Sequence, residues 1–193
     1  NDRESFYQEI EEQIKAMRKD GAEFIIVYPH WGIEYQMTEA SWQREIAQKL
    51  CDMGVDAIIG GHPHVIEPVD VFTSEDGTHK TFCAFSLGNQ LSNQRREMMR
   101  LKTGNTEDGL FIDLEITRNK KGDVSLTGVK YIPTWVYKNA SGPTYSIVPV
   151  DDPSTVEEKT GIKGIQAQAQ ASYDRTYKII GDGVNKVSEA YGF

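Results

Sequence analysis

Three of the four histidines in the sequence lie in two short stretches whose composition suits metal binding. His62 and His64 are two residues apart, behind the glycine pair Gly60-Gly61, and His30 stands in a separate Pro-His-Trp-Gly stretch. Neutral imidazole is the commonest protein ligand for metal ions. The glycines let the backbone come close to whatever the imidazoles hold. These residues therefore predict a metal site, and the alternative is a pair of loops whose imidazoles bond backbone carbonyl groups.

The elements around these histidines predict that the three side chains meet. Residues 24–28 and 55–59 are continuous apolar runs, typical of buried strands, and an amphipathic helix pattern separates them. A strand, helix and strand in this order form a parallel pair. His30 follows the first strand, and His62 and His64 follow the second. Since ligands of open α/β sheets bind at the carboxyl edge, we expect one shared site there.

Four further side chains are candidates for the same site. Glu34 is the candidate catalytic residue, either as a partner of a histidine or as a substrate contact, and a solvated glutamate is the alternative. Trp31 is a substrate-binding wall or a core tryptophan. Ser86 and Asn89 offer an oxygen and an amide for substrate binding, or simply form a turn. Three imidazoles are too few for a hydrolytic two-metal centre, which also needs carboxylate or amide ligands.

The composition of the chain argues against one class of function. The chain has 193 residues, a formal net charge of -8 and no basic stripe, which argues against nucleic-acid binding. The one basic cluster, Arg95-Arg96 with Arg100 and Lys102, is interpreted as a solvated loop, and the alternative is a polyanion site. Cys51 and Cys83 are expected to be buried free thiols, with a single bridge as the alternative in an oxidising compartment. Asp56 is interpreted as a turn residue and His79 as a surface residue.

The rest of the chain predicts alternating helices and strands. Because the sequence opens on Asn1 rather than Met, we expect it to be part of a longer protein. Thr38 is the expected N-cap of the second helix, and Pro133 predicts an edge strand or a bulge. The expected elements are a helix at 5–19, a hairpin of strands 68–72 and 80–85, a surface loop at 90–108, strands at 110–117, 124–136 and 145–150, and a helix at 162–180 that Gly181-Asp182-Gly183 separates from a final short one.

Three blocks of sequence resemble a known family. They are Tyr28-Pro29-His30-Trp31-Gly32-Ile33-Glu34-Tyr35, then residues 54–65 around the Gly-His-Pro-His stretch, then Phe85-Ser86-Leu87-Gly88-Asn89. In order and spacing they are similar to the capsule-synthesis CapA family of poly-γ-glutamate synthesis proteins. Residues 131–136 resemble that family's closing β segment. The resemblance covers residues 24–150, and Gln90 departs from it, where a phenylalanine is common.

This resemblance implies an α/β fold of the calcineurin-like metallophosphoesterase type, a two-sheet sandwich flanked by helices. Residues 1–150 would be the C-terminal half of that domain, and residues 151–193 a helical extension. Two divalent metal ions (Mn, Fe or Zn) are implied, with His30 and His62 binding one and His64 the other. The remaining ligands would come from an N-terminal half of the domain, which carries Asp, Gly-Asp and Gly-Asn-His motifs and is absent here.

The resemblance also implies a function. It points to a metal-dependent hydrolase acting on an anionic polymer or a phosphoester in capsule or poly-γ-glutamate synthesis or processing. The alternative is a non-catalytic accessory factor for polymer synthesis or export at the cell surface. Either protein is expected to be extracellular or on the cell surface, held to the membrane only by an anchor in a missing N-terminal segment, and to bind no nucleic acid.

Overall fold

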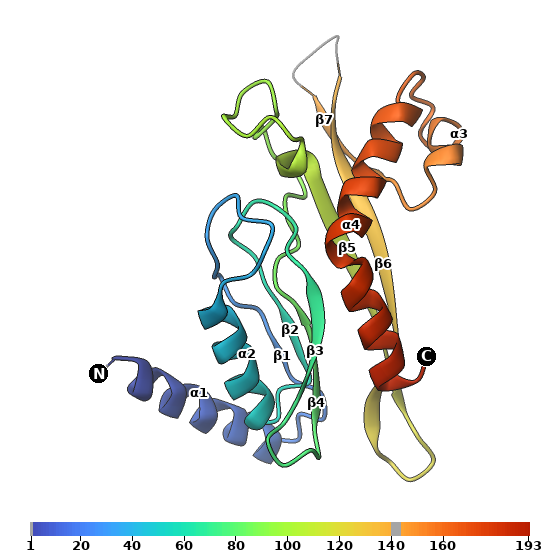
Figure 1. Cartoon of the computed structure of the whole chain (residues 1–193). Helices are drawn as coiled ribbons and strands as arrows, with labels where there is room; N and C mark the ends of the chain where they lie inside the picture. Colours follow the sequence, from blue (N-terminus) through green and yellow to red (C-terminus); the bar gives the residue numbers. More distant parts are fainter. Residues whose placement is uncertain (1, 140–143) are drawn as a thin grey trace.

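The protein is a mixed α/β structure with two sheets, as predicted. A computed structural model describes residues 2–139 and 144–193 (Figure 1). The elements are α1 (Asp2–Lys19), β1 (Ile26–Val27), α2 (Ser41–Asp52), β2 (Ala57–Ile59), β3 (Val69–Thr73), β4 (Lys80–Ala84), η1 (Asn105–Glu107), β5 (Asp108–Arg118), β6 (Val124–Lys138), β7 (Tyr145–Pro149), η2 (Pro153–Thr155), α3 (Val156–Thr160) and α4 (Gln166–Tyr191).

The first sheet carries the histidine loops. Its strands run in the order β1-β2-β4-β3, with β1, β2 and β4 parallel and β3 antiparallel to β4. The expected parallel pair and hairpin are therefore confirmed. The prediction that residues 24–28 are buried on both faces is wrong, because β1 is an edge strand. Ile26 is 50% exposed and Tyr28 is 68% exposed.

The two N-terminal helices cover one face of this sheet. Ile14 of α1 and Leu50 of α2 pack with Ile58 and Phe85 in one buried apolar cluster. Cys51 and Cys83 are buried and free, as expected. The N-cap predicted at Thr38 is wrong, since α2 begins at Ser41. The Gln43 side chain accepts a hydrogen bond from the Ala40 N–H at this helix start (2.7 Å). The first N–H groups of a helix have no partner within the helix, and this bond supplies one.

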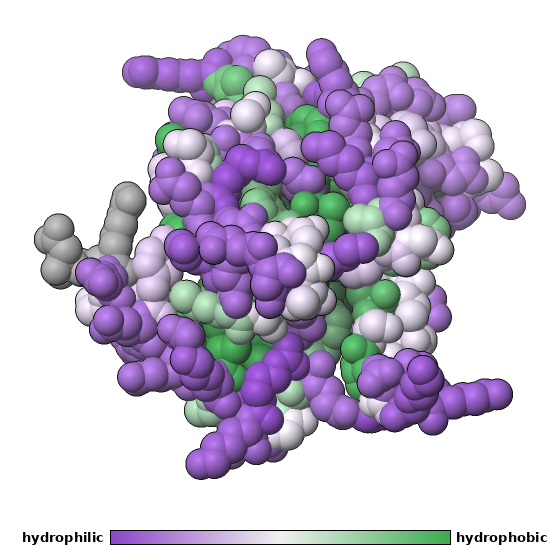
Figure 2. Space-filling model, turned by 60° about the horizontal axis from the view of Figure 1, so that its bottom comes forward, coloured by the Kyte–Doolittle hydropathy of each residue, from purple (hydrophilic) through white to green (hydrophobic). Residues whose placement is uncertain are grey.

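A second core lies between the two sheets and α4. Phe82 of β4, Leu110 of β5, Leu126 of β6 and Ile180 of α4 all belong to it. In Figure 1, α4 runs along β5 and β6. Figure 2 shows the face seen from below, where hydrophilic side chains dominate and hydrophobic ones lie in recesses between them. Among the described residues, no helix combines the length and the apolar character needed to cross a bilayer.

The second sheet is antiparallel in the order β5-β6-β7, so β6 is its middle strand. The interpretation of Pro133 as a mark of an edge is confirmed, since residues 124–133 of β6 pair with β5 alone and the pairing with β7 begins at Thr134, whereas no bulge lies at Pro133. The register shift lies between Glu115 and Ile116 instead. Val150 N donates to Pro133 O (2.8 Å), and proline has no N–H to return. The β6–β7 ladder accordingly starts one residue later, at Thr134.

Helix α4 continues through Gly181-Asp182-Gly183, so the predicted break there is wrong. Gly183 serves close packing instead: a Cβ atom on it would lie 1.8 Å from Val69 O of β3.

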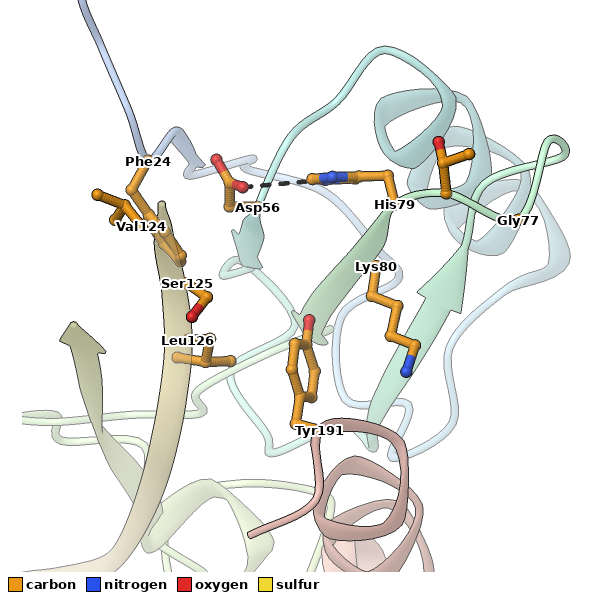
Figure 3. A pocket seen from close by; sticks show the side chains of 10 residues that line it. Phe24, Asp56, Gly77, His79, Lys80, Val124, Ser125, Leu126 and Tyr191 are labelled. Carbon is orange, nitrogen blue, oxygen red and sulfur yellow. Dashed lines mark ion pairs between the residues drawn. The ribbon is translucent and has the colours of Figure 1, made fainter. Parts of the chain in front are cut away.

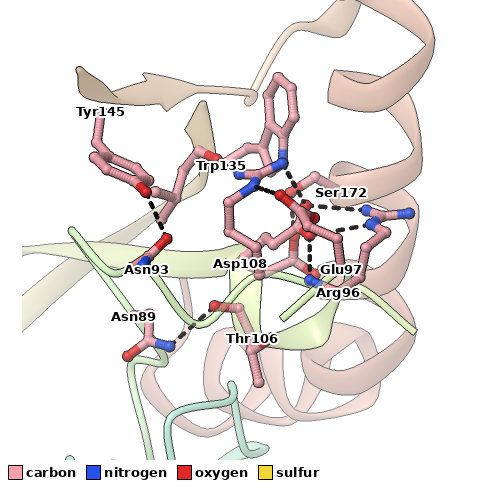
Figure 4. A network of polar contacts seen from close by, with 12 residues as sticks. Asn89, Asn93, Arg96, Glu97, Thr106, Asp108, Trp135, Tyr145 and Ser172 are labelled. Carbon is pink, nitrogen blue, oxygen red and sulfur yellow. Dashed lines mark hydrogen bonds and ion pairs between the residues drawn. The ribbon is translucent and has the colours of Figure 1, made fainter. Parts of the chain in front are cut away.

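Polar contacts fix the other end of α4. Both Arg175 and Ser172 donate to the Asp108 carboxylate at 2.7 Å (Figure 4). The division of the chain at residue 150 stays a prediction.

We expect Gly183→Ala to destabilise the protein by about 2 kcal/mol or more, because the added methyl group collides with a strand backbone that cannot move aside. Gly181→Ala is the matched control. A Cβ atom on Gly181 would meet nothing within 4 Å, so this change should stabilise the helix by up to about 1 kcal/mol. Urea unfolding of both variants tests the pair. Equal effects would contradict the close packing of α4 on β3.

Candidate metal centre

The loops after β1 and β2 are joined by backbone hydrogen bonds that extend the parallel pairing beyond the strands. Gly61 N donates to Pro29 O (3.1 Å), and Trp31 N donates to Gly61 O (3.0 Å). Tyr35 N then donates to Pro63 O (2.7 Å). His30 forms an isolated parallel bridge with Gly61. The two loops therefore hold their histidines at one edge of the sheet, as the sequence predicts.

Two glycines allow this close approach. Gly32 has a φ of +97°, and a Cβ atom on it would lie 2.7 Å from the Pro63 side chain. A Cβ atom on Gly60 would lie 2.0 Å from Phe85 O, in the loop after β4. Any larger residue at either position would push the loops apart. The two glycines are thus needed because they lack a side chain that would collide with the neighbouring loop, as well as for their conformational freedom.

The three imidazoles form a row. The ring centroids of His30 and His62 are 4.4 Å apart, and those of His62 and His64 are 6.4 Å apart. His62 and His64 both have positive φ angles, 111° and 61°, which non-glycine residues seldom adopt. Such strain persists where the surroundings over-determine the backbone, and it gathers at functional sites.

Asn89 fixes the orientation of His64. The Asn89 amide Nδ2 donates to His64 O (3.1 Å) and Thr106 O (2.9 Å), the second of which is drawn in Figure 4. Its Oδ1 therefore faces His64 Nδ1 at 3.0 Å as an acceptor. That contact places the imidazole proton on Nδ1 and leaves the Nε2 lone pair free for a metal ion. The Tyr35 ring stacks on the same imidazole, with centroids 6.0 Å apart.

The other candidate residues divide into two groups. Glu34 Oε1 lies 4.0 Å from His64 Nε2, and the Glu34 side chain is half exposed. Trp31 is buried, and its Nε1 donates to Phe85 O (2.8 Å). Ser86 is buried, and its Oγ donates to Val65 O (2.8 Å). Glu34 thus faces the imidazoles, while Trp31 and Ser86 hold the loops beneath them.

The fourth histidine lies elsewhere. His79 Nε2 contacts Val55 O (2.8 Å), just before β2, whereas the other histidines follow strand ends. It lines a different pocket, shown in Figure 3 with Asp56 and Tyr191. Asp56 accepts hydrogen bonds from Arg18 (2.5 Å) and from Ile25 N (2.6 Å). Its role is to join α1 to the sheet, in line with the structural interpretation of this residue.

Glu67, a buried carboxyl group behind the loops, was not identified from the sequence. Glu67 is fully buried, and its Oε2 accepts a hydrogen bond from Gln43 Nε2 (2.9 Å). Its Oε1 has no partner among the described residues. Burial raises the pKa of Glu67 to about 7. The signal in the sequence was a glutamate inside the otherwise apolar stretch 65–69.

An apolar cavity opens beside the imidazoles. It has a volume of about 490 Å³ and lies between α1, α2 and the edge of the first sheet. His30 and His62 form its polar end, and the rest of the lining is mainly apolar, including Phe6, Trp42 and Ile46. A ligand that contacts the histidines therefore has an apolar surface next to it.

The three histidines fit part of a metal-ligand set. They are unburied or only partly buried imidazoles, and the chemistry suits a divalent transition metal. Within residues 2–139 and 144–193, however, no group of three or more His, Cys, Asp or Glu side chains could hold a metal ion. The described residues thus offer imidazoles without the carboxylates of a two-metal hydrolytic centre.

Comparison with known proteins finds a family that resembles the part of the chain with the histidine loops. The model of the family described as "Bacterial capsule synthesis protein PGA_cap" matches residues 2–94, which include all of the histidine loops. This N-terminal part of the chain, a little under half of its length, is therefore similar to that family. The predicted resemblance to capsule-synthesis CapA proteins is thereby confirmed.

Two curated relatives agree with the family. The chain is 31% identical over 111 residues to the PGA biosynthesis protein CapA of Bacillus subtilis (strain 168), covering 58% of this chain and 26% of that protein. It is 34% identical over 80 residues to the capsule biosynthesis protein CapA of Bacillus anthracis, covering 42% of this chain and 18% of that protein. The chain thus spans about a quarter or less of each relative.

We expect His64 to carry its proton on Nδ1, and Asn89→Ala to shift it toward the Nε2–H tautomer by removing the acceptor. Long-range ¹H–¹⁵N correlation spectra of the imidazoles distinguish the two forms. His79 is the internal control, because its Nε2 faces a carbonyl oxygen and should stay protonated in both proteins. An Nε2–H tautomer of His64 before substitution would contradict the assigned role of Asn89.

We expect the stability of the protein to fall as pH rises from about 4.5 to about 7. In that range the folded protein keeps the Glu67 proton that the unfolded chain has released. Glu67→Gln removes this loss, so the variant should match the parent at pH 5 and exceed it by about 1–3 kcal/mol at pH 8. Urea unfolding at both pH values is the measurement. If the difference in the free energy of unfolding between the parent and the variant were the same at pH 5 and pH 8, the raised pKa of Glu67 would be refuted.

Proposed function

We propose that the chain forms part of a metal-dependent hydrolase of the metallophosphoesterase type that acts in capsule or poly-γ-glutamate synthesis or processing. The observation that carries this proposal is the row of three imidazoles on two hydrogen-bonded loops, with His64 held in the tautomer that leaves Nε2 free. The similarity of residues 2–94 to the capsule synthesis family supports the biological setting. Phosphoesters and anionic polymers are the proposed substrate classes.

His30 and His62 would bind one divalent ion and His64 the other. Bound divalent ions polarise a phosphoryl or acyl oxygen and lower the pKa of a bound water. Asn89 would keep the His64 ring in register, and Tyr35 would limit its rotation by stacking. Glu34 lies near enough to His64 Nε2 (4.0 Å) to orient the ring or to take part in proton transfer.

The missing carboxylate ligands would come from an N-terminal half of the same domain. Two observations support this part of the proposal. The edge strand β1 pairs on one side only among the described strands, and its Ile26 and neighbouring Tyr28 are largely exposed. The matched relatives are also several times longer than the aligned segments. An added strand along β1 would bring further loop ends toward the histidines.

The alternative is a non-catalytic accessory factor for polymer synthesis or export. The absence of a sufficient ligand group within the described residues favours it. Under either proposal the protein would act outside the cell or at its surface, through an N-terminal anchor. The two proposals differ in one property, which is turnover by the metal-loaded full-length protein.

We expect Mn²⁺ or Zn²⁺ to bind the full-length protein and His30→Ala, His62→Ala and His64→Ala each to weaken binding about 10-fold or more. Isothermal titration calorimetry measures the affinity. His79→Ala is the matched control and should bind as the parent does, since His79 lies in another pocket.

Hydrolysis of a model phosphodiester and of poly-γ-glutamate by the metal-loaded protein separates the two proposals. Activity that falls with the three histidine variants supports the hydrolase. Metal binding without turnover supports the accessory factor. No metal binding by the full-length protein would contradict the proposed metal centre itself.

A further inference from the structure

A second concave surface lies beside the loop that follows Asn89. It is a cavity of about 460 Å³, a size that suits a small ligand. Most of its lining comes from three segments: residues 95–96 of the loop, residues 135, 137 and 138 of β6, and the turn before α4 at residues 163–165. Glu107 of η1 and Gln168 of α4 complete it. The family comparison ends at residue 94 and so covers none of them.

The lining of this cavity is strongly cationic. Arg95, Arg96, Lys138 and Lys163 all line it, against the single carboxylate of Glu107. The whole chain, by contrast, has a formal net charge of -8. A concentration of positive charge in a concave surface of an acidic protein focuses the field on anions.

The Glu107 carboxylate is already neutralised. It accepts hydrogen bonds from Arg96 Nε (3.0 Å) and from Trp135 Nε1 (3.2 Å), and Arg95 lies 3.6 Å away. Burial would raise the pKa of Glu107, but the bonds from Arg96 hold it below its ordinary value. The cluster at residues 95–96, interpreted from the sequence as a solvated loop, is thus anchored on a buried carboxylate (Figure 4).

The two lysines are free of such a structural role. Neither Lys138 nor Lys163 has an ion-pair partner among the described residues, and the only described contact of the Lys138 ammonium is with the Tyr145 ring at 5.9 Å. Lys163 is exposed. Tyr137 lines the wall between them and packs edge-on against Trp135, with centroids 5.6 Å apart. The cavity therefore combines unpaired cations with an aromatic wall.

We propose that this cavity binds an anionic chain that carries several carboxylates, through Lys138, Lys163 and the outer face of Arg96. Cations contributed by three separate segments fit a ligand with several charges better than one small anion. The choice of glutamate as the repeating unit rests on the proposed function, whereas the polyanion site does not. Asn89 links the two sites, since its Nδ2 also donates to Gln94 (3.1 Å), next to Arg95.

The experiment is calorimetric titration of the protein with a γ-linked glutamate oligomer at low ionic strength, with EDTA present so that metal binding plays no part. We expect the double variant Lys138→Gln/Lys163→Gln to bind the oligomer about tenfold or more weakly. The matched control is Lys120→Gln/Lys121→Gln, which removes two exposed lysines from the β5–β6 turn and should bind as the parent does. Binding should also weaken at high salt.

Three outcomes would overturn the proposal. The first is no binding of the oligomer by the parent protein. The second is equal binding by the two double variants, which would place the oligomer elsewhere. The third is inorganic phosphate binding as tightly as the oligomer and displacing it, which would define a site for a single anion. A full-length parent protein that binds the oligomer but shows no metal binding or no turnover would count against the proposed hydrolase alone.

Discussion

The hydrogen bonds that join the two histidine loops are the constraint on which the site depends. Gly61 both donates to Pro29 O and accepts from Trp31 N, so the parallel pairing of β1 and β2 continues where the strands have ended. Without that continuation, His30 and His62 would be carried by two independent loops. With it, the backbones of the two loops stay at the spacing of neighbouring strands, about 4.8 Å, and His30, in register with Gly61, has its ring 4.4 Å from that of His62. The relative position of the two histidine loops therefore follows from the pairing of the strands in the sheet.

Much of this arrangement could be predicted from the sequence, because it follows from local pattern and topology. The apolar runs before His30 and His62 indicate strands, and the helix between them implies parallel pairing. The same reasoning failed where contacts between distant parts of the chain determine the local structure. It read Gly183 as a helix break, whereas the glycine makes room for the backbone of β3. It also read β1 as fully buried, although that strand lies at the sheet edge.

Polar side chains were the least predictable part of the site. Asn89 and Ser86 were candidates either for substrate binding or for a turn, and their described hydrogen bonds go to the protein itself, with Asn89 on His64 and Ser86 on Val65 O. The hydrogen-bond partner of Glu67 could not be foreseen, since a single glutamate in an apolar stretch suggests burial but does not show whether its partner is water or Gln43. Periodicity identifies which face of an element is buried, but it does not identify hydrogen-bond partners far along the chain.

The left-handed backbone at His62 and His64 has an evolutionary consequence. Glycine would adopt those angles without strain, so for folding alone it would be the better residue at both positions. Selection for a robust fold therefore opposes selection for an imidazole at these two positions. A lineage that has lost the proposed metal centre should drift toward glycine there, which makes these two codons a natural record of whether the imidazoles are still under selection.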